Sequence, residues 1–218
     1  TALLERGRLK EAIRRYEKGL ALFTEAGNEP YRGQAYLRLG DVYRKMDRPD
    51  LASQYYVESL GVFGRMESDQ RAGPLIRLAS LLAERGELET AESYAQDSLA
   101  LYRRARDEHK AREVLLELAV IESKRGEHEK AVSAAREAIQ LAEVHGDLAG
   151  KAVGLDRLAQ VRAQAGEPDA ARACWEDARG LFEELRDTRA SVVADSLTGL
   201  AAARAMPQQH PRSPVFRQ

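Results

Sequence analysis

Apolar residues along this chain recur at the spacing of one face of an α-helix. Leu75, Leu78 and Leu82, for example, stand at positions i, i+3 and i+7. A period of about 3.6 residues predicts amphipathic helices. Strand-like alternation of apolar and polar residues is missing throughout, so the sequence predicts an all-α fold.

The helical pattern returns about every 40 residues. The segments ERGRLKEA, KMDRPDLA, ERGELETA, KRGEHEKA and QAGEPDAA share a frame, and their final alanines are 40, 39, 40 and 40 residues apart. Those alanines are Ala12, Ala52, Ala91, Ala131 and Ala171. Five residues before them stand Gly7, Asp47, Gly86, Gly126 and Gly166. Self-similarity at such a period is the signature of a repeat protein.

Further columns agree with this frame and divide each unit into two helices. Small residues precede the alanine by twelve positions: Gly40, Ala79, Ala119 and Ala159. An aromatic column follows it by eleven positions: Phe23, Phe63, Tyr102, Ala142 (an exception) and Phe182. We expect the glycine column to end each first helix in a left-handed turn, where Asp47 is tolerated. The small residues are expected where the two helices approach closely.

These columns resemble the tetratricopeptide repeat. The second unit reads Tyr36-x2-Leu39-Gly40-x2-Tyr43 and then Ala52-x3-Tyr56, with tyrosines in place of the family's Trp and Phe. The resemblance covers residues 1 to about 205 and implies a right-handed α-solenoid of about five repeats plus a half-repeat. The units are 39–42 residues long rather than 34. This implies longer helices, as in kinesin light chains and bacterial regulators.

The frame also predicts the domain boundaries. Residues 1–206 are expected to form the superhelix, with the first repeat truncated at its N-terminus: residues 1–6 end one helix and Gly7 forms the turn. Residues 207–218 contain Pro207, Pro211 and Pro214, so they are expected to form a tail or linker. Because the chain starts at Thr1, within the pattern, it is expected to come from a longer polypeptide.

Composition removes several classes of partner. Lys and Arg number 34 against 35 Asp and Glu, a formal net charge of -1, so direct nucleic-acid contact is not expected. No apolar run approaches the roughly 18–20 residues of a membrane span. The single cysteine, Cys174, excludes an intramolecular disulfide and a cysteine-based metal cluster. We therefore expect a cytoplasmic protein without membrane contact.

No motif in the sequence predicts catalysis. Glycine-rich phosphate loops are missing, and His128-Glu129 starts like a zinc-protease helix but continues to Val132 instead of a second histidine. The four histidines form no i, i+4 pair. We expect no catalytic residue, no metal ligand and no cofactor, so the protein is not expected to be an enzyme.

The resemblance implies that the first helix of each pair lines a concave binding face. The candidate partner-binding residues are Leu37, Asp41, Arg44, Lys45, Ile76, Ser80, Leu116, Val120, Lys124, Asp156 and Gln160. Their apolar members either form a shallow stripe for an amphipathic or acidic peptide or pack against a neighbouring helix. If the first alternative holds, Leu116→Asp weakens partner binding and leaves thermal stability nearly unchanged. Separately, Arg38, Arg77 and Arg157 recur in one context and are expected to form ion pairs with the adjoining helix.

These observations favour a non-catalytic scaffold for a protein or peptide, or for other domains of the same chain. The long repeats resemble the sensory, partner-docking arrays of larger bacterial regulatory proteins of the transcriptional-regulator type. A stand-alone peptide receptor of the quorum-sensing type is the alternative, and an enzyme is less favoured. Self-association through the truncated N-terminal end is a further expectation.

Overall fold

The structure is a computed structural model and describes residues 2–205, which form ten α-helices and one 3₁₀ helix without strands. The first helices of the pairs are α2 (Glu29–Lys45), α4 (Ala72–Arg85), α6 (Glu108–Lys124), α8 (Leu148–Gln164) and α10 (Arg189–Ala205). The second helices are α1 (Ala2–Glu25), α3 (Pro49–Arg65), α5 (Leu88–Arg104), α7 (His128–Val144) and α9 (Pro168–Glu184). The 3₁₀ helix η1 (Asp69–Arg71) joins α3 to α4. The predicted tail, residues 207–218, lies outside the described residues.

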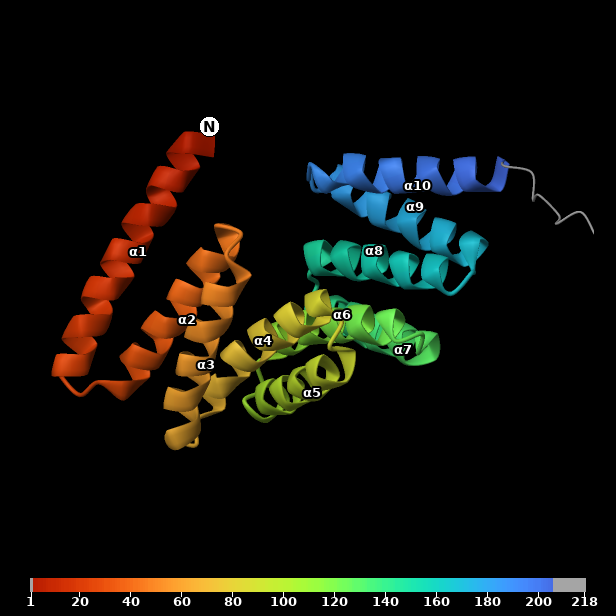
Figure 1. Cartoon of the computed structure of the whole chain (residues 1–218). Helices are drawn as coiled ribbons and strands as arrows, with labels where there is room; N and C mark the ends of the chain where they lie inside the picture. The colour runs from red at the N-terminus through yellow and green to blue at the C-terminus, as the bar shows by residue number, and fades with distance from the viewer. Residues whose placement is uncertain (1, 206–218) are drawn as a thin grey trace, which may run out of the picture.

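The helices stack in chain order from α1 to α10, each mainly against its sequence neighbours (Figure 1). This confirms the all-α, right-handed solenoid expected from the repeats. First helices also contact one another across the second helix between them, as α6 and α8 do. One face of the stack is therefore made by the first helices.

The predicted glycine turns are confirmed at four of five positions. Gly86, Gly126 and Gly166 have φ values of 84°, 80° and 78°, and Asp47 takes the same left-handed conformation at 57°. Gly7 does not, because α1 continues through it. The turn predicted at Gly7 is therefore wrong. One glycine costs a helix only about 1 kcal/mol, so Gly7 does not by itself end α1.

A second column of left-handed residues lies between the pairs and was not predicted. It consists of Gly27, Glu67, Arg106, Gly146 and Arg186. The next residue along the chain is always Asn, Ser or Asp, and its side chain accepts a backbone N–H two or three residues ahead: Asn28, Ser68, Asp107, Asp147 and Asp187. These side chains satisfy N–H groups that have no acceptor within the helix that follows.

Aromatic rings fill the notches left by the small residues of the first helices. A Cβ atom at Gly40 would lie 2.4 Å from the Tyr56 ring, and one at Gly33 would lie 2.7 Å from the Phe63 ring. Both rings are fully buried. The close approach predicted for the small residues is thus confirmed at Gly40, where the facing residue is Tyr56.

In the fourth unit, the large and the small residue of such a contact change places between the two helices. Gly33 and Phe63 belong to columns in which the fourth unit has Arg112 and Ala142 instead. Arg112 is buried and its guanidinium donates to Asp147 at the start of α8. The exception in the aromatic column thus coincides with a large side chain on the facing helix.

Candidate functional site

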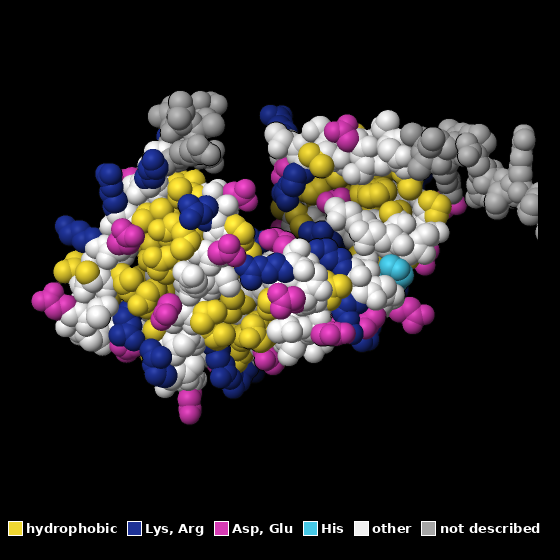
Figure 2. Space-filling view, viewed as in Figure 1, with side chains coloured by type: hydrophobic (Ala, Val, Ile, Leu, Met, Phe, Trp, Pro, Cys, Tyr) yellow, Lys and Arg dark blue, Asp and Glu magenta, His cyan; other side chains and the backbone are white. Residues whose placement is uncertain are grey.

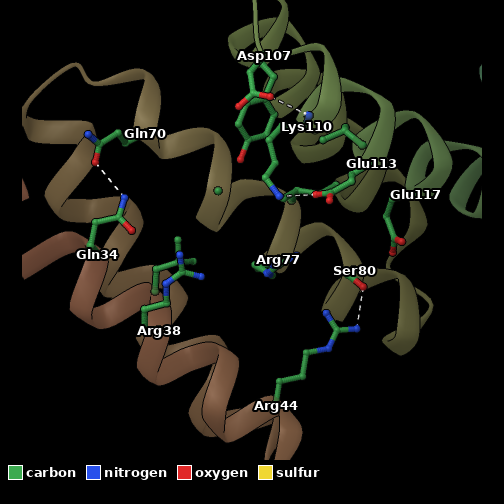
Figure 3. A pocket seen from close by; sticks show the side chains of 15 residues that line it. Gln34, Arg38, Arg44, Gln70, Arg77, Ser80, Asp107, Lys110, Glu113 and Glu117 are labelled. Carbon is green, nitrogen blue, oxygen red and sulfur yellow. Dashed lines mark hydrogen bonds and ion pairs between the residues drawn. The ribbon is translucent and has the colours of Figure 1, made fainter. Parts of the chain in front are cut away.

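A groove of about 590 Å³ lies on the face made by the first helices, between α2, α4 and α6 (Figure 3). Helix α2 contributes Gln34, Leu37, Arg38 and Arg44; α4 contributes Gly73, Ile76, Arg77 and Ser80; and α6 contributes Lys110, Glu113, Val114 and Glu117. Gln70, Tyr102 and Asp107 complete the lining. Three consecutive helix pairs therefore build one site.

The groove has an apolar base. Leu37, Ile76 and Val114 each come from a different helix and line the same space. Ile76 is half-buried, whereas Leu37 and Val114 are buried. Gly73 lies beside them, and a Cβ atom there would be 3.1 Å from Leu37, so a larger residue would fill part of the groove. Figure 2 shows the mixed surface of the molecule, with apolar patches between charged side chains.

Asp41 was predicted to contact a partner, but its carboxylate is used inside the protein. It accepts from the Tyr56 hydroxyl at 3.1 Å, from Arg77 Nε at 2.9 Å and from Arg38 Nη1 at 3.4 Å. These bonds tie α2 to α3 and α4. Burial raises the pKa of Tyr56, and the Asp41 charge raises it further. Asp41 therefore holds the helices that carry the groove.

The repeated arginines differ from one another. Arg77 forms the ion pair with the adjoining helix that the sequence predicted. Burial lowers the Arg77 pKa, but the charge and hydrogen bond of Asp41, together with the nearby Tyr56 and Glu113, raise it overall. Arg38 reaches Asp41 of its own helix only at 3.4 Å. Arg157 donates to Gln160 of its own helix at 2.8 Å. The prediction is thus confirmed for Arg77 and wrong for Arg38 and Arg157.

Two basic residues bridge neighbouring first helices. Arg44 donates to Ser80 at 2.8 Å and to Glu84 at 2.5 Å, which joins α2 to α4. Lys124 donates to the Ala83 carbonyl at 3.1 Å, which joins α6 to α4. Lys45 is exposed outside the groove. Of these predicted site residues, Arg44 and Ser80 line the groove and Lys45 and Lys124 do not.

The predicted site residues of α6 and α8 lie away from the groove. Leu116 is buried in the main apolar cluster, so the alternative of packing against neighbouring helices describes it. Val120 is half-buried. Asp156 accepts from Trp175 Nε1 at 2.9 Å and from Gln160 at 3.0 Å. The polar side chains in this part of the concave face bond to one another.

Sequence reasoning missed the α6 wall of the groove. Lys110 donates to Glu113 at 2.7 Å, and Asp107 caps the start of the helix. Glu117 follows on the same wall and occupies the position of Arg38, Arg77 and Arg157 in the other units. That change of sign in a repeated column was visible in the sequence and marks this wall as different.

No other chemistry emerges from the described residues. Among residues 2–205, no group of three or more His, Cys, Asp and Glu side chains is placed to hold a metal ion. Within the same residues, none of the helices has both the length and the apolar character needed to cross a membrane. Burial raises the pKa of the Cys174 thiol, which keeps it protonated at neutral pH.

The family model of the tetratricopeptide repeat matches residues 1–63 and 70–143, which is more than half of the chain. The chain belongs to the tetratricopeptide repeat family. The family's repeats account for the paired helices, the turn glycines and the small residues under the rings described above. No curated protein matches the sequence.

Solved structures share the fold at low sequence identity. A Rap protein complexed with Competence and Sporulation Factor aligns with a TM-score of 0.71 at 16% identity, over 90% of this chain and 60% of its own. A variant of a putative kinesin light chain from Podospora anserina, with nearly identical repeats, gives 0.69 at 15%, over 84% and 90%. BtubC from P. vanneervenii gives 0.66 at 17%, over 96% and 97%. The chain thus spans about 60% of the length of the Rap protein that it matches.

Proposed function

We propose that this tetratricopeptide repeat chain is a non-catalytic scaffold that binds a peptide segment of its partner in the groove between α2, α4 and α6. The groove combines an apolar base with polar walls, a combination that suits a peptide with one apolar side. The single observation that carries the proposal is that Leu37, Ile76 and Val114, from three successive repeats, line one open space.

The walls are prepared for a ligand because most of their polar groups are already held in place. Asp41 fixes Arg77, Ser80 and Glu84 fix Arg44, and Glu113 fixes Lys110. Side chains that are already ordered lose less conformational entropy when a ligand binds. The apolar base can then contribute to affinity without a large rearrangement of the walls.

The proposed biological setting is the partner-docking region of a larger bacterial regulatory protein in the cytoplasm. The repeat architecture supports a protein-binding scaffold in general. A specific observation favours the alternative of a peptide receptor of the quorum-sensing type: the similar Rap structure is a complex with Competence and Sporulation Factor. The coding sequence upstream of Thr1 tests the choice. A DNA-binding or nucleotide-hydrolysing module there favours the first setting, and a short helical bundle favours the second.

The groove is tested by selecting phage-displayed linear 12-residue peptides against the immobilised chain and measuring the affinities of the synthetic peptides. Ile76→Asp places a charge at the base of the groove, and Ile76→Ala removes apolar contact without adding charge. Val144→Asp is the matched control, since Val144 is 72% exposed at the end of α7. We expect Ile76→Asp to weaken binding at least about tenfold.

The control separates binding from folding. Ile76→Ala should weaken binding less, in the same direction, and Val144→Asp should leave it unchanged, while circular dichroism shows all variants folded. Selected peptides that bind Ile76→Asp as tightly as the unmodified chain would contradict the proposal.

A further inference from the structure

Glu117 departs from the repeat pattern, because it is acidic where α2, α4 and α8 carry an arginine. The first helices carry Arg38, Arg77 and Arg157 at one repeated position, in the contexts LRLG, IRLA and DRLA. In α6 the context is LELA and the residue is Glu117. The change places an acid where the other repeats present a base, and it does so in the helix that closes the groove.

The Glu117 carboxylate has no hydrogen-bond or ion-pair partner among the described residues, although the side chain is half-buried. Its neighbours on the wall are different. Glu113 accepts from Lys110 Nζ at 2.7 Å, and Asp107 accepts from the backbone N–H of Lys110 at 3.0 Å. Asp41 and Glu84, at the other helices, are also occupied. Glu117 is therefore the acid of this groove that remains available to a ligand.

The opposite wall supplies an available base. Arg38 on α2 has a side chain that is 54% exposed, and its contact with Asp41 is long, at 3.4 Å. Arg44 and Arg77 are committed to Glu84, Ser80 and Asp41. Figure 3 shows Arg38 on the α2 side of the groove and Glu117 on the α6 side. The available charges thus have opposite signs on opposite walls.

We propose that the groove selects a peptide that carries a lysine or arginine next to an apolar side chain. The inference rests on the peptide-binding function proposed above. The cationic group binds Glu117, and the apolar side chain lies on the half-buried Ile76, next to the buried Val114. Val114 precedes Glu117 by three residues on α6, so the two groups share one face of the helix. A carboxylate of the same peptide is directed to Arg38.

Because the available acid is Glu117, the groove favours a peptide with a cationic group over one with an anionic group. An arginine-lined concave face alone would favour an acidic peptide. Since Arg44 and Arg77 are neutralised within the protein, their charges add little to the attraction of a ligand. A half-buried carboxylate without a partner instead gains a charge-assisted hydrogen bond when a cation arrives.

The test is a double-mutant cycle on the peptides selected above. The peptide probes are one selected 12-residue peptide and the same peptide with its lysine replaced by norleucine. The protein variants are Glu117→Gln and, as the control, Glu176→Gln on the exposed surface of α9. We expect lysine or arginine to be enriched among selected peptides, and Glu117→Gln to weaken the lysine peptide about three- to tenfold. The norleucine peptide should bind both forms equally.

A second peptide selection uses a variant in which the charge at position 117 is reversed. Glu117→Arg should enrich aspartate and glutamate in place of lysine and arginine, and the Glu117→Gln effect should shrink at about 0.5 M salt. Peptides that depend on Ile76 but lack a basic residue, or that bind Glu117→Gln unchanged, would overturn this inference and leave the groove proposal standing. Peptides insensitive to Ile76→Asp would overturn both.

Discussion

The two halves of the stack use the same repeat differently. In α2–α5, large rings fill glycine notches, and Asp47, Glu67 and Arg106 occupy left-handed turns in addition to Gly86. The concave face of this half opens into the groove, whose far wall is α6. In α6–α9, the core is rich in buried alanines and the turns fall on glycines. There the concave polar groups bond to one another, as Asp156 does to Trp175. The groove half also has polar pairs across the concave face, such as Arg77 with Asp41, but beside them it keeps a half-buried Ile76 and a Glu117 without a partner among the described residues.

The largest expected difference in the free energy of unfolding is between variants of Leu116 and Ile76, which occupy the same position in their repeats. Leu116→Asp buries a charge in the main core and should lower the free energy of unfolding by about 3–5 kcal/mol. This replaces the expectation from sequence that Leu116→Asp would leave stability nearly unchanged. Ile76 faces the groove and packs against the edge of the same core while only half-buried, so Ile76→Asp should cost less, about 1–3 kcal/mol. Urea denaturation measures both, with Leu116→Met as a control that should cost under about 1.5 kcal/mol. Equal losses for the two aspartates would break the comparison.

Two aspartates of the concave face should also differ. Asp41→Asn removes the charge that pairs with Arg77 and should cost about 1–3 kcal/mol. Asp156→Asn should cost less than about 1 kcal/mol, since an amide oxygen still accepts from Trp175. Thermal unfolding followed by circular dichroism measures both. Trp175 is the chain's one tryptophan, so its fluorescence reports whether the indole environment in the Asp156 variant is intact. A larger loss at Asp156 would contradict the role assigned to Asp41.

A smaller effect tests the turns. Arg106 has a φ of 55°, a conformation that glycine adopts without a Cβ penalty. Arg106→Gly should therefore raise the free energy of unfolding by about 0.5–1 kcal/mol, whereas Gly126→Ala in the second half should lower it by a similar amount. Arg106→Ala is the control and should bring no such gain. Stabilisation by alanine as large as that by glycine would point to the arginine side chain rather than the backbone.

The smallest expected effect is a stability difference at neutral pH that disappears in acid. The N–H of Gly150 and then the Arg112 guanidinium lower the pKa of Asp147 below its usual range. The carboxylate therefore contributes stability above about pH 4, the ordinary pKa of an aspartate, and this contribution is lost as the pH falls through the lower folded pKa. Asp147→Asn should unfold at a lower temperature than the unmodified chain at neutral pH, and the difference should narrow in acid below that ordinary pKa. The exposed Asp97→Asn control should show no such pH dependence.

The repeat frame was readable from sequence because it depends on columns that backbone geometry constrains. Gly86, Gly126 and Gly166 end helices where a left-handed turn is needed, and Gly40 lies where a ring must fit. The second column of left-handed turns was not predicted because Glu67, Arg106 and Arg186 are residue types that seldom adopt a positive φ. The Asn, Ser and Asp residues that follow these positions and cap the next helix, from Asn28 to Asp187, could have indicated the turns in the sequence.

The site was predictable only in part. Leu37 and Ile76 were placed in the concave face by their register, and they line the groove. Asp41 and Asp156 share that face but bond to Tyr56 and Trp175, and the sequence does not show which polar groups on adjoining helices will meet. Leu116 follows the same register as Ile76, yet the packing of α6 buries it. The choice between groove and core depends on how closely neighbouring pairs approach.

The position of the groove walls has a mechanical consequence. The α2 and α6 walls belong to different helix pairs, with α4 between them, so a ligand that moves these walls apart changes the angle between neighbouring pairs. A bulky ligand would straighten or bend the superhelix and so displace α1 relative to α10. Occupancy at one point along the chain would then be converted into movement at both of its ends.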